Sequence, residues 1–106
     1  MQKIIISGCN GRMGHVVEAI CATNPALEIV AGFDILGGPR DFPVFSHPLE
    51  CKLAADVVID FSSPAALSSL LSFCTLRGIP VVLATTGYSD AQVEQIEAAS
   101  KTIPIF

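Results

Sequence analysis

The sequence predicts an α/β fold, a Rossmann-like doubly wound parallel sheet of about five strands with helices on both faces. Three observations lead to this prediction. Short apolar runs rich in β-branched residues alternate with longer segments of helical periodicity. A glycine-rich turn joins the first apolar run to the first helical segment. The apolar run at 56–61 is hydrophobic enough to be buried on both faces, as strands of parallel sheets are.

The first half of the chain begins with a β-branched run, Ile4 to Ile6, that favours a buried strand. The helical pattern after it stops at Asn24-Pro25, because proline disfavours helix in the residue before it. The elements expected here are a strand at 3–6, a helix at 12–23, a strand at 27–33, a loop at 34–45 with a short extended piece at 42–45, and one helical turn within 46–53.

The second half repeats the alternation of strand and helix. Ser63-Pro64 is a good helix start, with serine as the cap and proline in the first position, and Gly78 is a fitting stop. Ser89 and Gln92 have the spacing of a capping box. The elements expected here are a strand at 56–61, a helix from 64 to about 77, a strand at 80–84, a helix to about 100, and the start of a fifth strand at 103–106.

The first turn carries three glycines at a spacing of three, Gly8, Gly11 and Gly14. The first permits a tight turn, the second lets the backbone approach a phosphate, and the third lets the helix pack on the strand. The helix that follows offers free N–H groups to a pyrophosphate. Asp34 ends the second apolar run, where a dinucleotide-binding domain is expected to carry an acidic residue for the ribose hydroxyls. An ordinary strand-to-helix turn remains the structural alternative.

Composition excludes several classes of function. A formal charge of −4 gives no electrostatic reason to expect nucleic-acid binding, and no apolar run approaches the ~20 residues that span a membrane. Without a secretory signal pattern the chain is expected to be cytoplasmic, with its four cysteines reduced and no metal site. His15 and His47 are isolated, so neither is expected to act as a catalyst.

Three segments together resemble the nucleotide-binding domain of the dihydrodipicolinate reductase family. They are the G-x-x-G-R-M-G run at 8–14, the D-F-S-S-P run at 60–64 and the T-T-G-aromatic run at 85–88. The first run is the most specific, because Arg12-Met13 narrows the choice of families that the glycine run resembles. The resemblance covers essentially the whole chain. It implies a dinucleotide-binding domain over residues 1–106, and it places the family's substrate domain outside them.

The resemblance implies a role for each part of the site. Asp34 accepts hydrogen bonds from the adenosine ribose, and Phe61 lies beside the cofactor. Ala84, where the family usually has glycine, begins the segment that meets the nicotinamide. The residues implied in cofactor binding are Gly8, Cys9, Asn10, Gly11, Arg12, Met13, Asp34, Phe61, Ala84, Thr85 and Thr86.

The expected cofactor is NADH, with NADPH tolerated. A carboxylate that binds the ribose hydroxyls repels a 2′-phosphate, and Asp34 is followed by Ile35, where family members that use NADPH often have arginine. Two cations, Arg12 and Arg40, are candidates to reach such a phosphate from elsewhere.

The family's reaction is hydride transfer to the unsaturated cyclic dicarboxylate precursor of tetrahydrodipicolinate, in lysine and diaminopimelate biosynthesis. In the family, a following domain with a histidine pair and a lysine binds this substrate and usually forms a homotetramer. No catalytic residue is expected within residues 1–106, so this chain alone is expected to bind nucleotide with little turnover.

Alternatives remain at several positions. Asp34 and Thr85-Thr86 have a plain interpretation as strand ends, Phe61 as a core residue, and Asp60 as a structural hydrogen-bond acceptor. Two other functions also fit the first turn: a Rossmann-type nucleotide sensor or CoA-binding module, and another two-domain dehydrogenase acting on aspartate or its semialdehyde.

Overall fold

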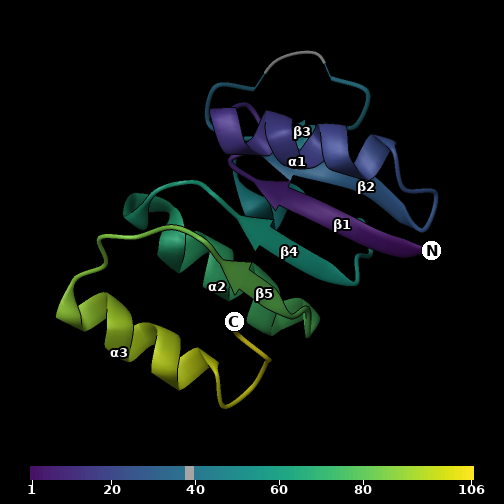
Figure 1. Cartoon of the computed structure of the whole chain (residues 1–106). Coiled ribbons are helices and arrows are strands. Elements are labelled where there is room, and N and C mark those ends of the chain that lie inside the picture. Colours follow the sequence, from purple (N-terminus) through teal and green to yellow (C-terminus); the bar gives the residue numbers. More distant parts are fainter. Residues whose placement is uncertain (38–39) are drawn as a thin grey trace.

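A single parallel sheet forms the centre of the computed structural model, which describes residues 1–37 and 40–106. Its strand order is β3-β2-β1-β4-β5, and every pair is parallel (Figure 1). This order reverses direction at β1, as in the doubly wound fold that the sequence predicts. The strands are β1 (Gln2–Ser7), β2 (Leu27–Phe33), β3 (Val44–Phe45), β4 (Val57–Asp60) and β5 (Val81–Leu83).

Helices cover both faces of the sheet, which confirms the predicted arrangement. Helix α1 (Arg12–Ala22) lies on one face, and α2 (Leu67–Arg77) and α3 (Asp90–Ala99) lie on the other (Figure 1). Two 3₁₀ turns, η1 (Pro48–Glu50) and η2 (Pro64–Ala66), lie in the connections on either side of β4. Among the helices of the described residues, none is long and apolar enough to cross a membrane.

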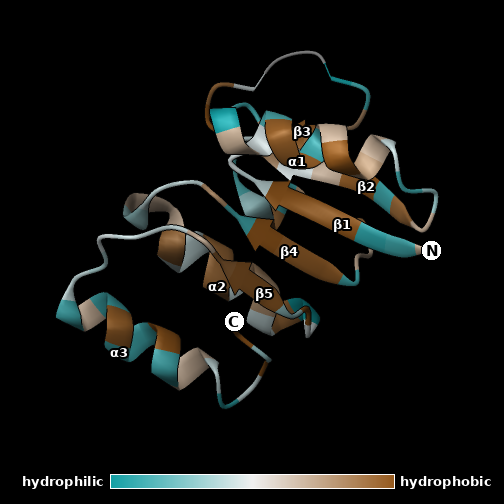
Figure 2. Ribbon diagram, in the orientation of Figure 1, coloured by the Kyte–Doolittle hydropathy of each residue, from teal (hydrophilic) through white to brown (hydrophobic). Residues whose placement is uncertain are grey.

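The apolar strands separate two hydrophobic clusters (Figure 2). Ile5 and Val58 point toward α2 and α3, whereas Ile4 and Ile6 point toward α1, because successive side chains of a strand alternate between faces. The larger cluster includes an edge-to-face contact between Phe33 and Phe73, with ring centroids 5.2 Å apart. The smaller cluster lies between the sheet and α1.

Strand β2 contains a bulge. Ile4 of β1 pairs with Ile29 and the next residue, Ile5, pairs with Ala31, so Val30 is the extra residue. Ile29 packs in the cluster beneath α1, whereas Val30 and Ala31 both pack in the cluster beneath α2. The alternation of faces is therefore inverted in the second half of β2.

Two element predictions differ from the structure. Ser63 makes no side-chain cap, and the turn at Pro64 is 3₁₀, so α2 itself begins only at Leu67. The expected strand at 103–106 forms one bridge, Ile105 to Val81, beside the edge of β5. The predicted stop at Gly78, with a φ of 66°, and the capping box of α3 are confirmed.

Several apolar residues of α1 are exposed, so they do not form one continuous buried stripe along the helix. Cys21 is buried and Val17 packs against the cluster, but Met13, Val16 and Ile20 are exposed. Gly14 is buried instead, because α1 approaches the first turn closely at that residue. The periodicity predicted the helix correctly and indicated a broader buried face than α1 has.

Candidate functional site

The glycine turn connects β1 to α1 at the carboxyl edge of the sheet. The N–H of Gly8 donates to Phe33 O over 2.7 Å, and the N–H of Phe61 donates to Ser7 O over 2.8 Å, so the ends of β1, β2 and β4 lie together. Gly8 has a φ of +86°, and a Cβ there would lie 2.9 Å from the carbonyl carbon of Phe61. Glycine is therefore required for the loops after β1 and β4 to approach this closely.

The N-terminus of α1 is suited to an anion. Gly11 caps the helix without a side-chain hydrogen bond, and the first turn contains no acidic residue. The first N–H groups of a helix have no partner within it, and the helix dipole adds partial positive charge there. Arg12, exposed in the first position, adds a full positive charge.

Among the described residues, a Cβ on Gly11 would meet Gly8 O alone within 4 Å, at 3.4 Å, so these residues leave space in front of this helix end. Together with the uncapped N–H groups, this fits a pyrophosphate bound against bare backbone.

Asp34 lies opposite the glycine turn, at the end of β2. One carboxylate oxygen accepts the N–H of Asn10 over 3.0 Å, and the other accepts the N–H of Leu36 over 3.0 Å. These bonds fix the carboxylate but use only part of its capacity, since two carboxylate oxygens offer about four acceptor sites. The half-buried Asp34 therefore retains acceptor capacity for hydroxyl groups of a ligand.

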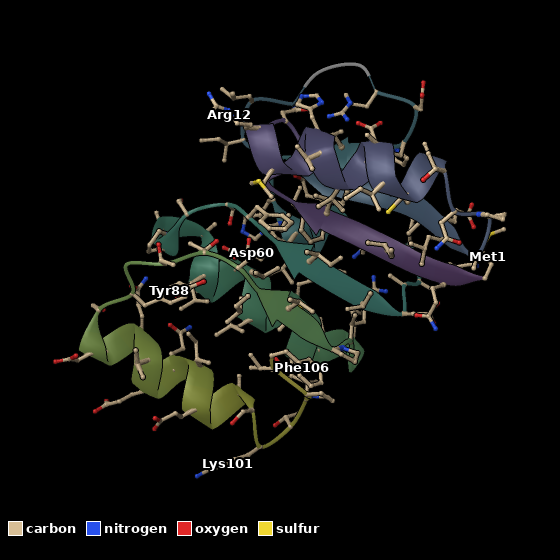
Figure 3. The ribbon with its side chains drawn as sticks, viewed as in Figure 1. Met1, Arg12, Asp60, Tyr88, Lys101 and Phe106 are labelled. Carbon is tan, nitrogen blue, oxygen red and sulfur yellow. The ribbon has the colours of Figure 1, made fainter. Side chains whose placement is uncertain are left out.

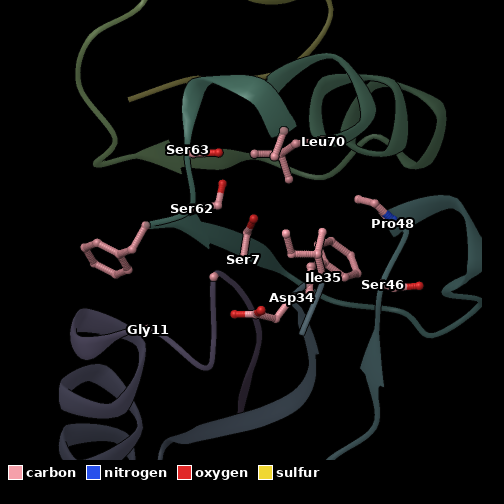
Figure 4. A pocket seen from close by; sticks show the side chains of 13 residues that line it. Ser7, Gly11, Asp34, Ile35, Ser46, Pro48, Ser62, Ser63 and Leu70 are labelled. Carbon is pink, nitrogen blue, oxygen red and sulfur yellow. The ribbon is translucent and has the colours of Figure 1, made fainter. Parts of the chain in front are cut away.

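A cavity of about 270 Å³ opens at this edge of the sheet (Figure 4). It contains four of the predicted site residues, Gly8, Gly11, Asp34 and Phe61. In Figure 4 the Asp34 carboxylate points toward Gly11, and Leu70, Ile35 and Pro48 enclose the other side. The other residues that line the cavity are Ser7, Phe33, Ile35, Ser46, Pro48, Ser62, Ser63, Ala66 and Leu70.

None of these additional residues was predicted as a site residue. Ser46 and Pro48 follow β3, so the rule that ligands bind at strand ends would have found them had the piece at 42–45 been counted as a strand. Leu70 carries no such signal, because its helical spacing is that of any core leucine.

Cys9 is in the predicted set, but its thiol does not face the cavity. The side chain is 0% exposed and lies beneath Gly32, where a Cβ would be 2.5 Å from the sulfur. Burial, and then the negative charge of Asp34, raise the pKa of this thiol. Only the backbone of Cys9 is placed to contribute to a site.

Arg40 is held beside the glycine turn. Its guanidinium pairs with Glu18 of α1, donates to Cys9 O over 3.1 Å and to Asn10 Oδ1 over 2.5 Å, and lies 4.9 Å from the centre of the Phe42 ring. The side chain is 13% exposed. The two arginines considered for a 2′-phosphate therefore differ, since Arg40 is already engaged and Arg12 is exposed.

The last predicted segment lies beyond β5. Ala84 and Thr86 are exposed, as is Met13 at the start of α1, and none of these lines the cavity. The Thr85 hydroxyl donates to Asp60 Oδ2 over 2.9 Å. The structure thus brings together one predicted group around Gly8, Gly11, Asp34 and Phe61, and it leaves the segment 84–86 outside the cavity, at the same carboxyl edge of the sheet.

Comparison with known proteins decides the family. The sequence model described as "Dihydrodipicolinate reductase, N-terminus" matches residues 2–106, nearly the whole chain. The chain belongs to this family. It is 51% identical over 106 residues to the 4-hydroxy-tetrahydrodipicolinate reductase of Caldanaerobacter subterraneus subsp. tengcongensis and 45% identical over 107 residues to that of Clostridium novyi. It spans 42% of the length of each of these relatives.

A solved structure supports the fold of this dihydrodipicolinate reductase domain. The dipicolinate-bound dihydrodipicolinate reductase from Paenisporosarcina sp. TG-14 matches with a TM-score of 0.78 at 23% identity, covering 94% of this chain and 43% of that one. The matches therefore correspond to the N-terminal, nucleotide-binding part of the family. Within residues 1–37 and 40–106, no group of three or more His, Cys, Asp or Glu side chains is arranged to hold a metal ion.

Proposed function

We propose that this chain binds NADH, and more weakly NADPH, as the nucleotide-binding domain of a 4-hydroxy-tetrahydrodipicolinate reductase. The observation that carries the proposal is the cavity between the glycine turn and Asp34, at the carboxyl ends of β1, β2 and β4. In doubly wound folds, ligands bind at this switch point. The names of the relatives supply the enzyme class.

The proposed placement of the cofactor follows the chemistry of the lining residues. The N–H groups at the start of α1 and the charge of Arg12 receive the pyrophosphate. Asp34 accepts hydrogen bonds from the adenosine ribose. The apolar wall formed by Ile35, Pro48 and Leu70 suits the adenine ring.

Phe61 and the segment formed by Ala84, Thr85 and Thr86 lie on the side assigned to the nicotinamide. When bound, the reduced nicotinamide supplies the hydride. The task of these residues is to orient the ring and shield it from water. The acceptor proposed is the unsaturated cyclic dicarboxylate of the family reaction, held by a substrate domain that corresponds to the rest of the relatives' length.

The preference for NADH rests on charge. A carboxylate at Asp34 repels a 2′-phosphate, Ile35 beside it is neutral, and Arg40 is paired with Glu18. We place residues 1–106 as one dinucleotide-binding domain of a cytoplasmic enzyme that assembles through its substrate domain. The chain alone is proposed to bind nucleotide and to turn over little substrate.

Calorimetric titration with NADH, NADPH and coenzyme A tests the proposal. We expect NADH to bind more tightly than NADPH, and Asp34→Asn to weaken NADH binding by roughly 1.5–3 kcal/mol, the value of hydrogen bonds to a charged group. Glu97→Gln, the same chemical change on exposed α3, is the matched control and should leave binding unchanged. Binding of coenzyme A without binding of either nicotinamide nucleotide would favour the sensor alternative and refute the proposal.

A further inference from the structure

The Asp60 carboxylate connects two loops at the carboxyl edge of the sheet. One oxygen accepts two hydrogen bonds from Ser62, one from its N–H over 3.1 Å and one from the Ser62 hydroxyl over 2.5 Å. The other accepts the Thr85 hydroxyl over 2.9 Å. The backbone adds a further link, because Asp60 O accepts the N–H of Ala84 over 2.9 Å. The end of β4 thus holds the loop after β4 and the loop after β5 together.

This carboxylate is buried, with 1% of the residue exposed. Figure 3 labels Asp60 at the end of β4. Among the described residues no basic side chain forms an ion pair with it. A buried carboxylate is costly unless hydrogen bonds compensate for the lost water, and within the described part of the chain they come from Ser62 and Thr85. Movement of either loop would leave the carboxylate unsatisfied, so these bonds restrain both loops.

Tyr88 follows Thr85 by three positions in the chain. Its hydroxyl is buried and makes no hydrogen bond among the described residues, and its ring packs against the larger cluster. Burial, and then the negative charge of Asp60, raise the pKa of the phenol. Both effects favour the neutral phenol, so Tyr88 adds no second negative charge beside Asp60.

We propose that Asp60 is a positioning residue for the nicotinamide end of the site. Through Thr85 it fixes the exposed backbone of Ala84 and Thr86 relative to Phe61, so that these groups meet the nicotinamide in one orientation. The Thr85 hydroxyl, already donated to Asp60, serves as the link rather than as a direct ligand. The inference rests on the proposed function and assigns within it the residue that orients one end of the cofactor.

The test compares NADH with ADP-ribose, which has the adenosine, pyrophosphate and second ribose but no nicotinamide. Asp60→Asn removes the charge of the acceptor, Thr85→Val removes the bond itself, and Thr85→Ser keeps a hydroxyl to restore it. Both disrupting variants are expected to weaken NADH binding roughly tenfold, about the value of one hydrogen bond to a charged group, and to change ADP-ribose binding less than twofold. Thr75→Val, which removes a hydroxyl bonded within α2, is the control and should change neither.

The double variant gives a second readout. If both substitutions act through one bond, Asp60→Asn combined with Thr85→Val loses no more NADH affinity than either single variant. Equal weakening of NADH and ADP-ribose, or unchanged NADH binding in a folded variant, would overturn the inference. If Asp60→Asn fails to fold, Thr85→Val against Thr85→Ser decides the question in the same way. Failure of the unsubstituted chain to bind either ligand would instead contradict the proposed function.

Discussion

Gly11 caps α1 and Gly14 lies in its first turn, but a side chain would find different space at each. A Cβ on Gly14 would lie 2.6 Å from both Cys9 O and Gly8 O, which are backbone atoms of the turn itself. Gly11 has a φ of −80°, which any residue adopts, and its nearest neighbour would be Gly8 O at 3.4 Å. Gly14 is therefore required by the fold, whereas Gly11 leaves room for a ligand.

Gly14→Ala is therefore expected to lower the free energy of unfolding by about 2–3 kcal/mol, since α1 must move away from the turn to admit a methyl group. Gly11→Ala is expected to change this free energy by less than about 1 kcal/mol, and to weaken NADH binding roughly tenfold because the methyl group occupies the approach to the helix N-terminus. Urea denaturation and calorimetric titration measure the two effects. The reverse pattern would contradict these assignments.

Glu18 is expected to influence cofactor choice from outside the cavity. In Glu18→Gln the guanidinium of Arg40 loses its ionic partner while keeping its bonds to Cys9 O and Asn10 Oδ1, and it becomes available to a phosphate near Asp34. We expect affinity for NADPH to rise by about 1 kcal/mol relative to NADH, within the range of partly exposed ion pairs. The ratio of the two dissociation constants is the measurement. Glu94→Gln on α3 is the control, and an unchanged ratio in Glu18→Gln would contradict the role of Glu18.

At the level of single residues, the sequence predicted backbone roles better than side-chain directions. The glycine pattern indicated a close approach of the first turn, and Gly8 and Gly14 confirm it. Cys9 was predicted in the same turn, yet its thiol points into the core because Gly32 leaves space there. That space is created by a residue 23 positions away, and no local pattern reveals it.

Among the elements, those with a defined start or stop were predicted best. Ser89 and Gln92 form the capping box that begins α3, with hydrogen bonds of 3.2 Å and 2.9 Å. Ser63-Pro64 has a similar composition, but the chain forms a 3₁₀ turn first and Ser63 makes no side-chain cap. The two helix starts differ in their hydrogen bonds. The side chains of the capping box satisfy two backbone N–H groups, whereas the side chains of the serine-proline pair satisfy none.

The capping box gives a prediction for α3. Ser89→Ala removes the acceptor for the N–H of Gln92, and we expect it to lower the free energy of unfolding by about 1 kcal/mol. Ser63→Ala removes a serine that makes no cap and is the matched control, with an expected change below about 0.5 kcal/mol. Urea denaturation of both variants measures the difference. Equal effects would show that the reciprocal bonds of α3 do not stabilise it.

For the whole molecule, the alternation of strands and helices predicted the parallel sheet, but not the full outline of the cavity. Ser46, Pro48 and Leu70 come from three separate segments that meet only because β3 pairs with β2 and α2 packs against the sheet. Such contacts depend on tertiary packing between distant segments. The sequence therefore predicted the glycine turn and Asp34 and missed the wall opposite them.

The buried thiols predict how the stability of the whole chain depends on pH. Burial raises the pKa of Cys74 from 9.0 to about 12, and it also raises the pKa of Cys21 and Cys9. Below pH 9 these thiols are neutral in both the folded and the unfolded chain. Above pH 9 the unfolded chain ionises first, so folding stability falls until the folded thiol also ionises near pH 12.

For Cys74 the expected loss is about 1.4 kcal/mol for each pH unit in this range. Urea denaturation at several pH values between 8 and 11, roughly the range that spans the ordinary thiol pKa, measures it under reducing conditions. Cys74→Ala is expected to be less stable at pH 8 because of the cavity it leaves, and to show a shallower decline. An equal decline in both proteins would assign the pH dependence to other groups.

The bulge at Val30 makes the number of residues in β2 as important as their identity. Because the extra residue inverts the alternation, Gly32 faces Cys9, and Phe33 faces α2. Removing the extra residue would close the bulge and leave Gly32 facing Cys9 and Phe33 facing α2, whereas inserting one further residue after Val30 would turn the Phe33 ring toward the space that now holds the Cys9 sulfur. Strand β2 is thus expected to tolerate the loss of one residue at the bulge, but not the gain of one, because an insertion inverts every side chain that follows it.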